Sequence, residues 1–210
     1  MESLFAMLKA RPAHALALAI LLYCAACAPP PKDSARPLGP GLNGVSPKLV
    51  LYNQNAQPVE ANSMMGRPLI IAFINTACTG MCRLTTNKLR RVADELGADQ
   101  KKKKLQFVLV TYNPVFDGPK HLTHYARDMH LDTERWILLT GTPVNIDWML
   151  GRFGLPAVGS VEDPAQLMDD LDYVFLVAPD GKILKKYKGG NFITTDVAQD
   201  ARSVLNKGAS

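Results

Sequence analysis

Two apolar segments, residues 69–74 and 105–111, enclose an amphipathic segment between them. The first, LIIAFI, has no polar residue, which is typical of a strand buried on both faces. The intervening segment repeats its inward residues at helical spacing and predicts one stripe packed on a sheet. This stripe consists of Thr85, Leu89, Val92 and Leu96. A strand, a helix and a strand in this order predict a right-handed parallel crossover.

Cys78 and Cys82 lie in the sequence CTGMC, where the first predicted strand leads into the helix. At that edge of a sheet the unpaired amides and the positive end of the helix dipole would meet Cys78. Such surroundings lower a thiol pKa, and the thiolate attacks disulfides and binds metals. Residues four apart in a regular helix are too distant for a disulfide, so we expect Cys78 before the helix, with Gly80 permitting the turn. The pair predicts a redox or soft-metal site; the alternative is two small buried side chains on one helical face.

Residues 1–26 have the features of a bacterial secretion signal. Lys9 and Arg11 precede an uncharged stretch that is short for a span of about 20 residues, so a transmembrane helix is the weaker alternative. Cys27 follows small residues, as at a lipoprotein signal-peptidase site, although Cys24 stands where leucine is usual. We therefore expect lipidation at Cys27. A freely secreted or otherwise anchored chain would still face the oxidising side of the membrane.

Residues 27–46 are rich in proline and glycine and predict a tether between the membrane and a folded domain. The remaining segment, residues 47–208, is long enough for one domain with a sizeable core and too short for two.

The net charge is +5, and +4 without residues 1–26, because these carry Lys9, Arg11 and Glu2. The lysine run at 101–104 is expected in a solvated connection between helix and strand. Neither a nucleic-acid-binding motif nor a basic face with stacking aromatics accompanies it, so nucleic acid is not an expected partner.

The remaining sequence predicts further helices and strands. Helices should begin at Pro119 and Pro143, with a short strand near 136–139 between them. Strands at 173–178 and 182–187 should form an antiparallel hairpin, and a helix at 194–205 should close the domain. The helix that begins at Pro119 should face the core with Leu122, Tyr125, Ala126 and Met129. This order predicts an α/β, thioredoxin-like single domain, with a central mixed sheet flanked by helices and the cysteine pair at the usual active-site position.

Several sequence segments resemble the Sco/SenC family of thioredoxin-like, copper-binding and thiol-active proteins. The resemblance spans roughly residues 49–205. The segments that match the family are FINTACTGMC at 73–82, Asn113-Pro114, Asp117-Gly118-Pro119, Arg135-Trp136, LTGTP at 139–143, Phe175-Leu176 and Pro179-Asp180-Gly181. The family resemblance implies copper binding and a role in assembling the CuA centre of cytochrome c oxidase.

The resemblance also implies a ligand set: two cysteines and a distant histidine hold copper in this family. Cys78 and Cys82 match the cysteines, but the position of the histidine falls at Asp170, and no histidine follows His130. Asp170 is kept as a candidate ligand for a harder ion; the alternative is an acid in a solvated acidic turn. Arg83 stands where the family usually has proline, and Asn113 where it usually has aspartate.

Two thiolates satisfy Cu(I), whereas Cu(II) generally needs added nitrogen or oxygen donors. Met81 could offer a thioether sulfur to Cu(I), and a role as a core-filling or loop-surface side chain explains it equally well. The three histidines of the predicted domain are expected on a solvated helix face or in the loop after it: His121, His124 and His130.

Three functions remain open. The first is a membrane-tethered assembly factor of the bacterial envelope that faces the periplasm and passes copper to the oxidase subunit carrying CuA. The second is a periplasmic thiol-disulfide oxidoreductase with no copper role, in which Cys78, expected to be the more exposed thiol, attacks and Cys82 resolves. The third is a degenerate interaction domain with a structural disulfide. A metallochaperone is favoured over an enzyme, and a disulfide resting state would require a periplasmic thiol reductase as a further partner.

Other catalytic classes lack their motifs. A peroxiredoxin loop needs proline and threonine where Ile71 and Asn75 stand, and no Ser-His-Asp, phosphate-loop or dinucleotide pattern is present.

Overall fold

The computed structural model describes residues 38–44, 49–103 and 105–207. The predicted secretion signal, the lipidation at Cys27 and residues 27–37 and 45–46 of the predicted tether lie outside the described residues. The described elements follow one another along the chain in the order β1 Val50–Asn53, β2 Pro58–Glu60, η1 Ala61–Met64, β3 Leu69–Ile74, α2 Met81–Lys103, β4 Gln106–Thr111, α3 Pro119–Asp128, β5 Trp136–Thr140, α4 Pro143–Arg152, η2 Val158–Ser160, α5 Pro164–Leu171, β6 Tyr173–Val177, β7 Ile183–Lys188 and α6 Thr194–Lys207.

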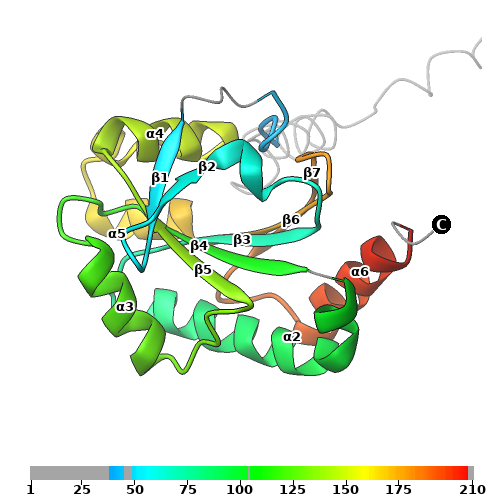
Figure 1. Ribbon diagram of the computed structural model, residues 1–210. Helices are drawn as coiled ribbons and strands as arrows, with labels where there is room; N and C mark the ends of the chain where they lie inside the picture. Colours follow the sequence, from blue (N-terminus) through cyan, green and yellow to red (C-terminus); the bar gives the residue numbers. More distant parts are fainter. Residues whose placement is uncertain (1–37, 45–48, 104, 208–210) are drawn as a thin grey trace, which may run out of the picture. The chain divides into compact units, whose positions relative to one another are not determined.

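A seven-stranded mixed sheet organises the domain, in the order β2-β1-β5-β4-β3-β6-β7 (Figure 1). Strands β3, β4 and β5 are parallel, while β1 joins β5 and β6 joins β3 in antiparallel fashion. The parallel pairing of β3 with β4 through α2 confirms the predicted crossover. All six residues of β3 are buried, because the strand lies inside the sheet and both of its faces are covered.

Helices cover both faces of the sheet. Figure 1 shows α2 and α6 together on one face and α4 on the other. Phe153, just after α4, packs edge-to-face against the rings of Phe73 (5.5 Å) and Phe175 (4.9 Å). These contacts attach the end of α4 to the second face of the sheet. The predicted α2 stripe is confirmed, since Thr85, Leu89, Val92 and Leu96 are all buried. The α/β, thioredoxin-like architecture is therefore as expected.

Three local expectations are wrong. Residues 101–103 belong to α2 instead of a loop, and the helix is interrupted earlier, at Gly97, whose φ is 49°. The acidic segment ending at Leu171 forms the helix α5, because Pro164 occupies its first turn and Asp163 caps it. Residues 38–44, expected in the tether, pack on the domain: Leu42 is fully buried and donates its N–H to Gly181 O (2.9 Å).

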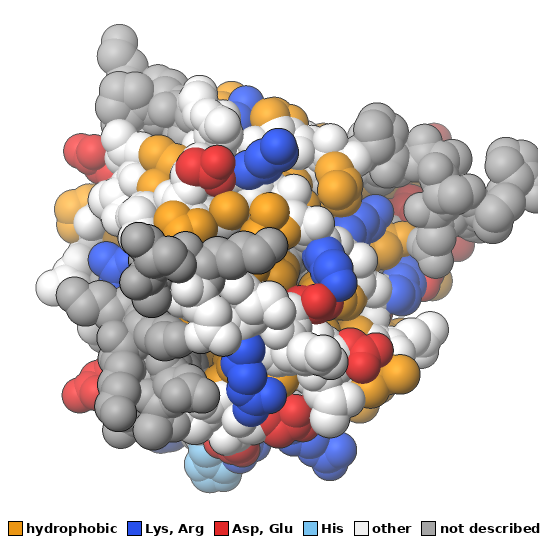
Figure 2. All heavy atoms as spheres, turned by 90° about the vertical axis from the view of Figure 1, so that its right-hand side faces the viewer, with side chains coloured by type: hydrophobic (Ala, Val, Ile, Leu, Met, Phe, Trp, Pro, Cys, Tyr) orange, Lys and Arg blue, Asp and Glu red, His pale blue; other side chains and the backbone are white. Residues whose placement is uncertain are grey.

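The domain surface carries charges of both signs. On the face drawn in Figure 2, basic and acidic side chains are interspersed, and neither forms a continuous patch. Within the described part of the chain, no helix combines the length and apolar character needed to cross a bilayer.

Candidate functional site

The loop between β3 and α2 places Cys78 just before the helix, as predicted. Asn75 shapes this loop, because its side-chain oxygen accepts the N–H of Ala77 (3.0 Å) and its carbonyl accepts the N–H of Cys78 (3.0 Å). The N–H of Cys82 then donates to Sγ of Cys78 (3.4 Å). The Cys78 sulfur therefore accepts one of the otherwise unpaired N–H groups of the first helical turn.

Both cysteines are free thiols and both are buried, with 8% of Cys78 and 7% of Cys82 exposed. Cys78 was expected to be the more exposed thiol, and the exposed fractions of the two side chains differ by only one percentage point. The thiols differ in their contacts, because the Cys78 sulfur accepts a helix N–H, whereas the Cys82 sulfur lies against the hydroxyl of Tyr112.

Cys82 lies against the carboxyl end of β4. Its Sγ is 3.6 Å from the hydroxyl oxygen of Tyr112, the residue that follows this strand. Burial, and next the hydrogen bond with Cys78, raise the pKa of Cys82 to about 12, although the bond with Tyr112 acts in the opposite direction. Burial and the charge of Cys82 also raise the pKa of Tyr112. At neutral pH the structure therefore favours a protonated Cys82.

A second tyrosine supports the same turn of α2. The hydroxyl of Tyr125 on α3 lies 2.9 Å from Thr86 Oγ1 and donates to the carbonyl of Cys82 (3.5 Å). Burial raises the pKa of Tyr125 as well. The sequence pattern placed Tyr125 on the inward face of α3 correctly, but gave no sign of its contact with the cysteine turn.

The acidic segment before β6 faces α2 through Asp172, not through Asp170. Asp170 is half-buried near the end of α5. Asp172 is buried, and its carboxylate accepts the hydroxyl of Thr85 (2.8 Å) and the N–H of Gly190 (2.8 Å). The expected solvated acidic turn is therefore a helix end followed by a buried carboxylate that fastens this segment to α2.

Met81 lies on the same side of α2. Its side chain is half-exposed, and its sulfur is 2.5 Å from the point that a Cβ on Gly190 would occupy. The thioether therefore covers the loop after β7.

The histidines lie on the surface, as expected. His121 stacks on Phe116 (4.5 Å between ring centroids), His124 contacts Arg127 (2.8 Å), and His130 occupies the turn after α3. Among the residues described, no cluster of three or more histidine, cysteine or acidic side chains is arranged to hold a metal ion. The two sulfurs of Cys78 and Cys82 form a donor pair whose softness fits Cu(I).

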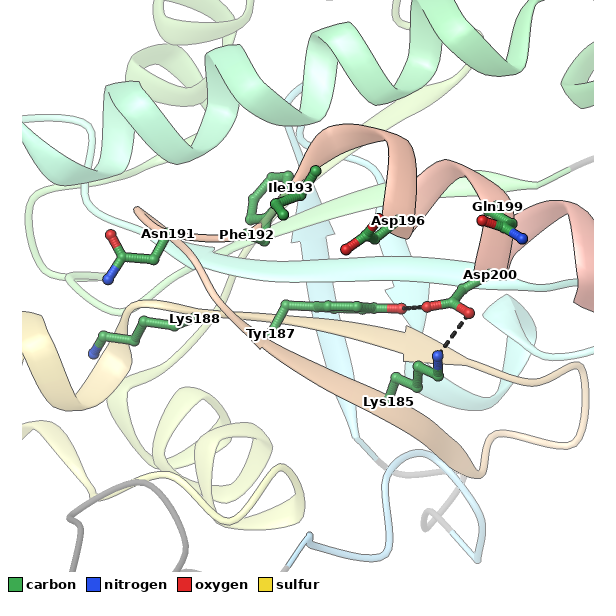
Figure 3. A pocket seen from close by; sticks show the side chains of 9 residues that line it. All are labelled: Lys185, Tyr187, Lys188, Asn191, Phe192, Ile193, Asp196, Gln199 and Asp200. Carbon is green, nitrogen blue, oxygen red and sulfur yellow. Dashed lines mark hydrogen bonds and ion pairs between the residues drawn. The ribbon is translucent and has the colours of Figure 1, made fainter.

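A separate hollow of about 520 Å³ lies between β7 and α6 and contains neither cysteine nor histidine (Figure 3). Its central polar groups pair with one another. Asp200 accepts the hydroxyl of Tyr187 (2.7 Å) and forms an ion pair with Lys185 (2.6 Å). Because these polar groups bind one another, we attribute the hollow to the packing of α6 on the sheet edge.

Sequence reasoning missed three buried side chains that contact a thiol or the segments carrying the thiols: Tyr112, Asp117 and Asp172. Tyr112 had a detectable signal, because it directly follows a predicted parallel strand and so had to lie at the same sheet edge as Cys78. The buried positions of the two aspartates depend on contacts with residues distant in sequence, which periodicity does not reveal.

The chain is similar to known proteins over most of its length. Residues 41–206 match the family model described as SCO1/SenC. A putative copper-binding protein of Stutzerimonas stutzeri is 32% identical over 138 residues, covering 65% of this chain and 66% of that protein, slightly under two thirds of its length. A SCO1 protein homolog of Bacillus subtilis is 28% identical over 153 residues, covering 72% and 78%.

Solved structures share the fold. A SCO1/SenC family lipoprotein of Bacillus anthracis has a TM-score of 0.60 and 23% identity, covering 74% of this chain and 91% of that one. Copper-bound Sco1 of yeast has a TM-score of 0.61 and 19% identity, covering 82% and 94%. BsSco, described as having a disulfide switch and as a member of a family of cytochrome c oxidase assembly proteins, has a TM-score of 0.61 and 23% identity, covering 83% and 99%. Because the family model covers most of the chain, this protein belongs to the SCO1/SenC family.

Proposed function

We propose that this protein binds Cu(I) through Cys78 and Cys82 as cargo and delivers it during assembly of the CuA centre of cytochrome c oxidase. The observation that carries the proposal is the pair of free, buried sulfurs at the start of α2. Thiolates are the preferred donors for Cu(I), and burial of the sulfurs excludes competing water. The SCO1/SenC family model and the putative copper-binding relative at 32% identity support copper as the cargo.

The two thiols have different roles in metal capture. Cys78, whose sulfur accepts the Cys82 N–H just before the helix, is the first ligand to engage the ion. Cys82 has a raised pKa and must lose its proton to the medium as the ion binds. Tyr112 is placed to hydrogen-bond the Cys82 sulfur once that proton has left. Asp170 remains a candidate for contact with a harder ion.

A cell-envelope location accompanies this proposal. Residues 1–26 act as the secretion signal, and lipidation of Cys27 holds the domain at the membrane, facing the periplasm. The lipoprotein among the structural neighbours supports this arrangement. Replacement of Cys27 by serine should abolish incorporation of a labelled fatty acid into the protein; incorporation that persists in this variant would contradict lipid anchoring at Cys27.

Copper retention by the reduced full chain tests the main proposal. The protein is held anaerobically in detergent and titrated with Cu(I) against a competing chelator. Cys78→Ser and Cys82→Ser should each abolish high-affinity retention, while Thr79→Ser, a change at an exposed residue between them, should not. Retention that survives both cysteine changes would refute the assignment of the site.

Thiol-disulfide exchange is the second candidate function, favoured by the different surroundings of the two thiols. Cys78 thiolate attacks a partner disulfide and releases one partner thiolate. Cys82 then attacks the mixed disulfide, releases the second thiolate and leaves a Cys78–Cys82 disulfide, so that two electrons pass to the partner. A periplasmic thiol reductase would restore the dithiol. Reduction of a model disulfide by protein that retains no copper would favour this function over the first.

A further inference from the structure

Asp117 is a fully buried carboxylate in the loop between β4 and α3. In the described part of the chain, no basic side chain forms an ion pair with it. Three donors compensate its burial: the N–H of Thr76 (3.0 Å), the hydroxyl of Thr76 and the hydroxyl of Thr111 (2.6 Å). Burial of a carboxylate without a cation destabilises the fold unless such hydrogen bonds are kept. These bonds therefore hold the donor groups of Thr76 and Thr111 firmly in place.

The three donors come from the two segments that hold the two thiols. Thr76 lies two residues before Cys78, in the loop that positions its sulfur. Thr111 ends β4 and immediately precedes Tyr112, whose hydroxyl contacts Cys82. One carboxylate therefore ties the Cys78 loop to the strand end that contacts Cys82.

The carboxylate is itself held in place by its own loop. The N–H of Asp117 donates to Asn113 O (2.8 Å), and the N–H of Asn113 donates to the hydroxyl of Thr111 (2.9 Å). These bonds fix the loop without help from the cysteine segment. Asp117 is thus a rigid acceptor on which the Cys78 loop is fastened.

We propose that Asp117 is a positioning residue for the thiol pair: it holds the Cys78 loop where the N–H of Cys82 reaches the Cys78 sulfur, and it thereby favours the dithiol over the disulfide. The inference rests on the proposed function only in taking Cys78 and Cys82 as the working site, and it requires no copper. Oxidation of the pair forms one S–S bond and releases two protons and two electrons, which pass to a disulfide oxidant. Loosening the loop should shift this equilibrium toward the disulfide.

The test equilibrates the full chain, without copper, in mixtures of reduced and oxidised glutathione. Mass spectrometry of the peptide that contains Cys78 and Cys82 measures the oxidised fraction, so that Cys24 and Cys27 do not interfere. Asp117→Asn should shift the equilibrium constant at least about tenfold toward the disulfide, equivalent to about 30 mV for a two-electron couple. Thr76→Val should shift it in the same direction, and Thr76→Ser, which keeps the hydroxyl, should restore the wild-type value.

The matched control is Asp200→Asn, at a carboxylate that also accepts a hydroxyl hydrogen bond but lies in the hollow between β7 and α6 (Figure 3). It should change the equilibrium constant by less than about twofold, even where it lowers stability. Three results would overturn the inference. In folded Asp117→Asn, the equilibrium constant could shift less than about threefold, or it could shift toward the dithiol. The third is a shift in Asp200→Asn equal to that in Asp117→Asn. If Asp117→Asn does not fold, the contrast between Thr76→Val and Thr76→Ser decides, and equal values for these two would overturn it. Failure of the wild type to retain Cu(I) would refute copper delivery without changing this result.

Discussion

The hydroxyl oxygen of Tyr112 lies 3.6 Å from Sγ of Cys82, and both side chains are buried. Cys78 has a different polar partner, the N–H of Cys82 (3.4 Å). The first contact comes from a strand end and the second from a helix start, so the sheet edge gives the two sulfurs different surroundings. This difference leads to distinct expectations for metal binding and for the effect of pH.

Tyr112→Phe should weaken Cu(I) binding about fivefold, the equivalent of about 1 kcal/mol for one hydrogen bond. The hydroxyl acts to lower the pKa of Cys82 against the effect of burial, so its loss makes the thiolate less favourable. Chelator competition under anaerobic conditions measures the change. Tyr52→Phe, at an exposed tyrosine on β1, is the matched control and should leave the affinity unchanged. Unchanged affinity in Tyr112→Phe would show that the hydroxyl does not act on the bound form.

The reduced protein should lose stability steeply as the pH rises above about 9. Burial is the first cause of the raised pKa of Cys82, Tyr112 and Tyr125, whose ordinary values are 9.0, 10.0 and 10.0. Above those values the unfolded chain releases these protons while the folded chain keeps them. The folded state then binds more protons, so the free energy of unfolding falls with pH, by up to about 1.4 kcal/mol per pH unit for each group.

Urea unfolding with excess reductant, at pH values from about 7 to 10.5, measures this loss. Tyr125→Phe should flatten the decline, because one of the three groups no longer titrates. A free energy of unfolding that stays level across the range would contradict the buried, protonated state of these groups.

The parts of the fold that depend on short-range patterns were predictable from sequence. The six apolar residues of β3 could only be a buried strand, and Pro119 and Pro143 begin α3 and α4 because proline suits the first helical turn. The strands β1 and β2 were not predicted. They are short and mix exposed with buried residues, and their pairing with β5 and with each other is set by the completed sheet.

The candidate site was predictable only in its cysteines. The position of Cys78 before the helix followed from the requirements of a thiol pair at a strand-to-helix turn. The burial of Asp172 could not be predicted, because Thr85 and Gly190, which stabilise it, come from segments far away in sequence. Asp163 and Pro164 did provide a local helix-start signal for α5, which the acidic composition of the following residues obscured.

Asp170→His should add Cu(II) binding while changing Cu(I) binding little. Two thiolates already satisfy Cu(I), whereas Cu(II) gains from an imidazole donor, so Cu(II) retention should rise at least about tenfold. Electron paramagnetic resonance of the bound Cu(II) and chelator competition measure the effect. Asp180→His, in the exposed turn between β6 and β7, is the control. Equal Cu(II) retention by both histidine variants would show that position 170 does not reach the thiols.

Gly189→Ala should lower the free energy of unfolding by about 2–3 kcal/mol, whereas Gly190→Ala should lower it by less than about 1 kcal/mol. A Cβ on Gly189 would lie 2.0 Å from Oδ1 of Asp172, so the carboxylate must move and lose its hydrogen bond from Thr85. A Cβ on Gly190 would instead meet the sulfur of Met81 at 2.5 Å, and that half-exposed, flexible side chain can turn away. Urea unfolding of the two variants measures the difference. Equal losses would mean that Met81 is held as firmly as Asp172, and the thioether would then be a fixed part of the packing on the loop after β7 instead of a movable cover.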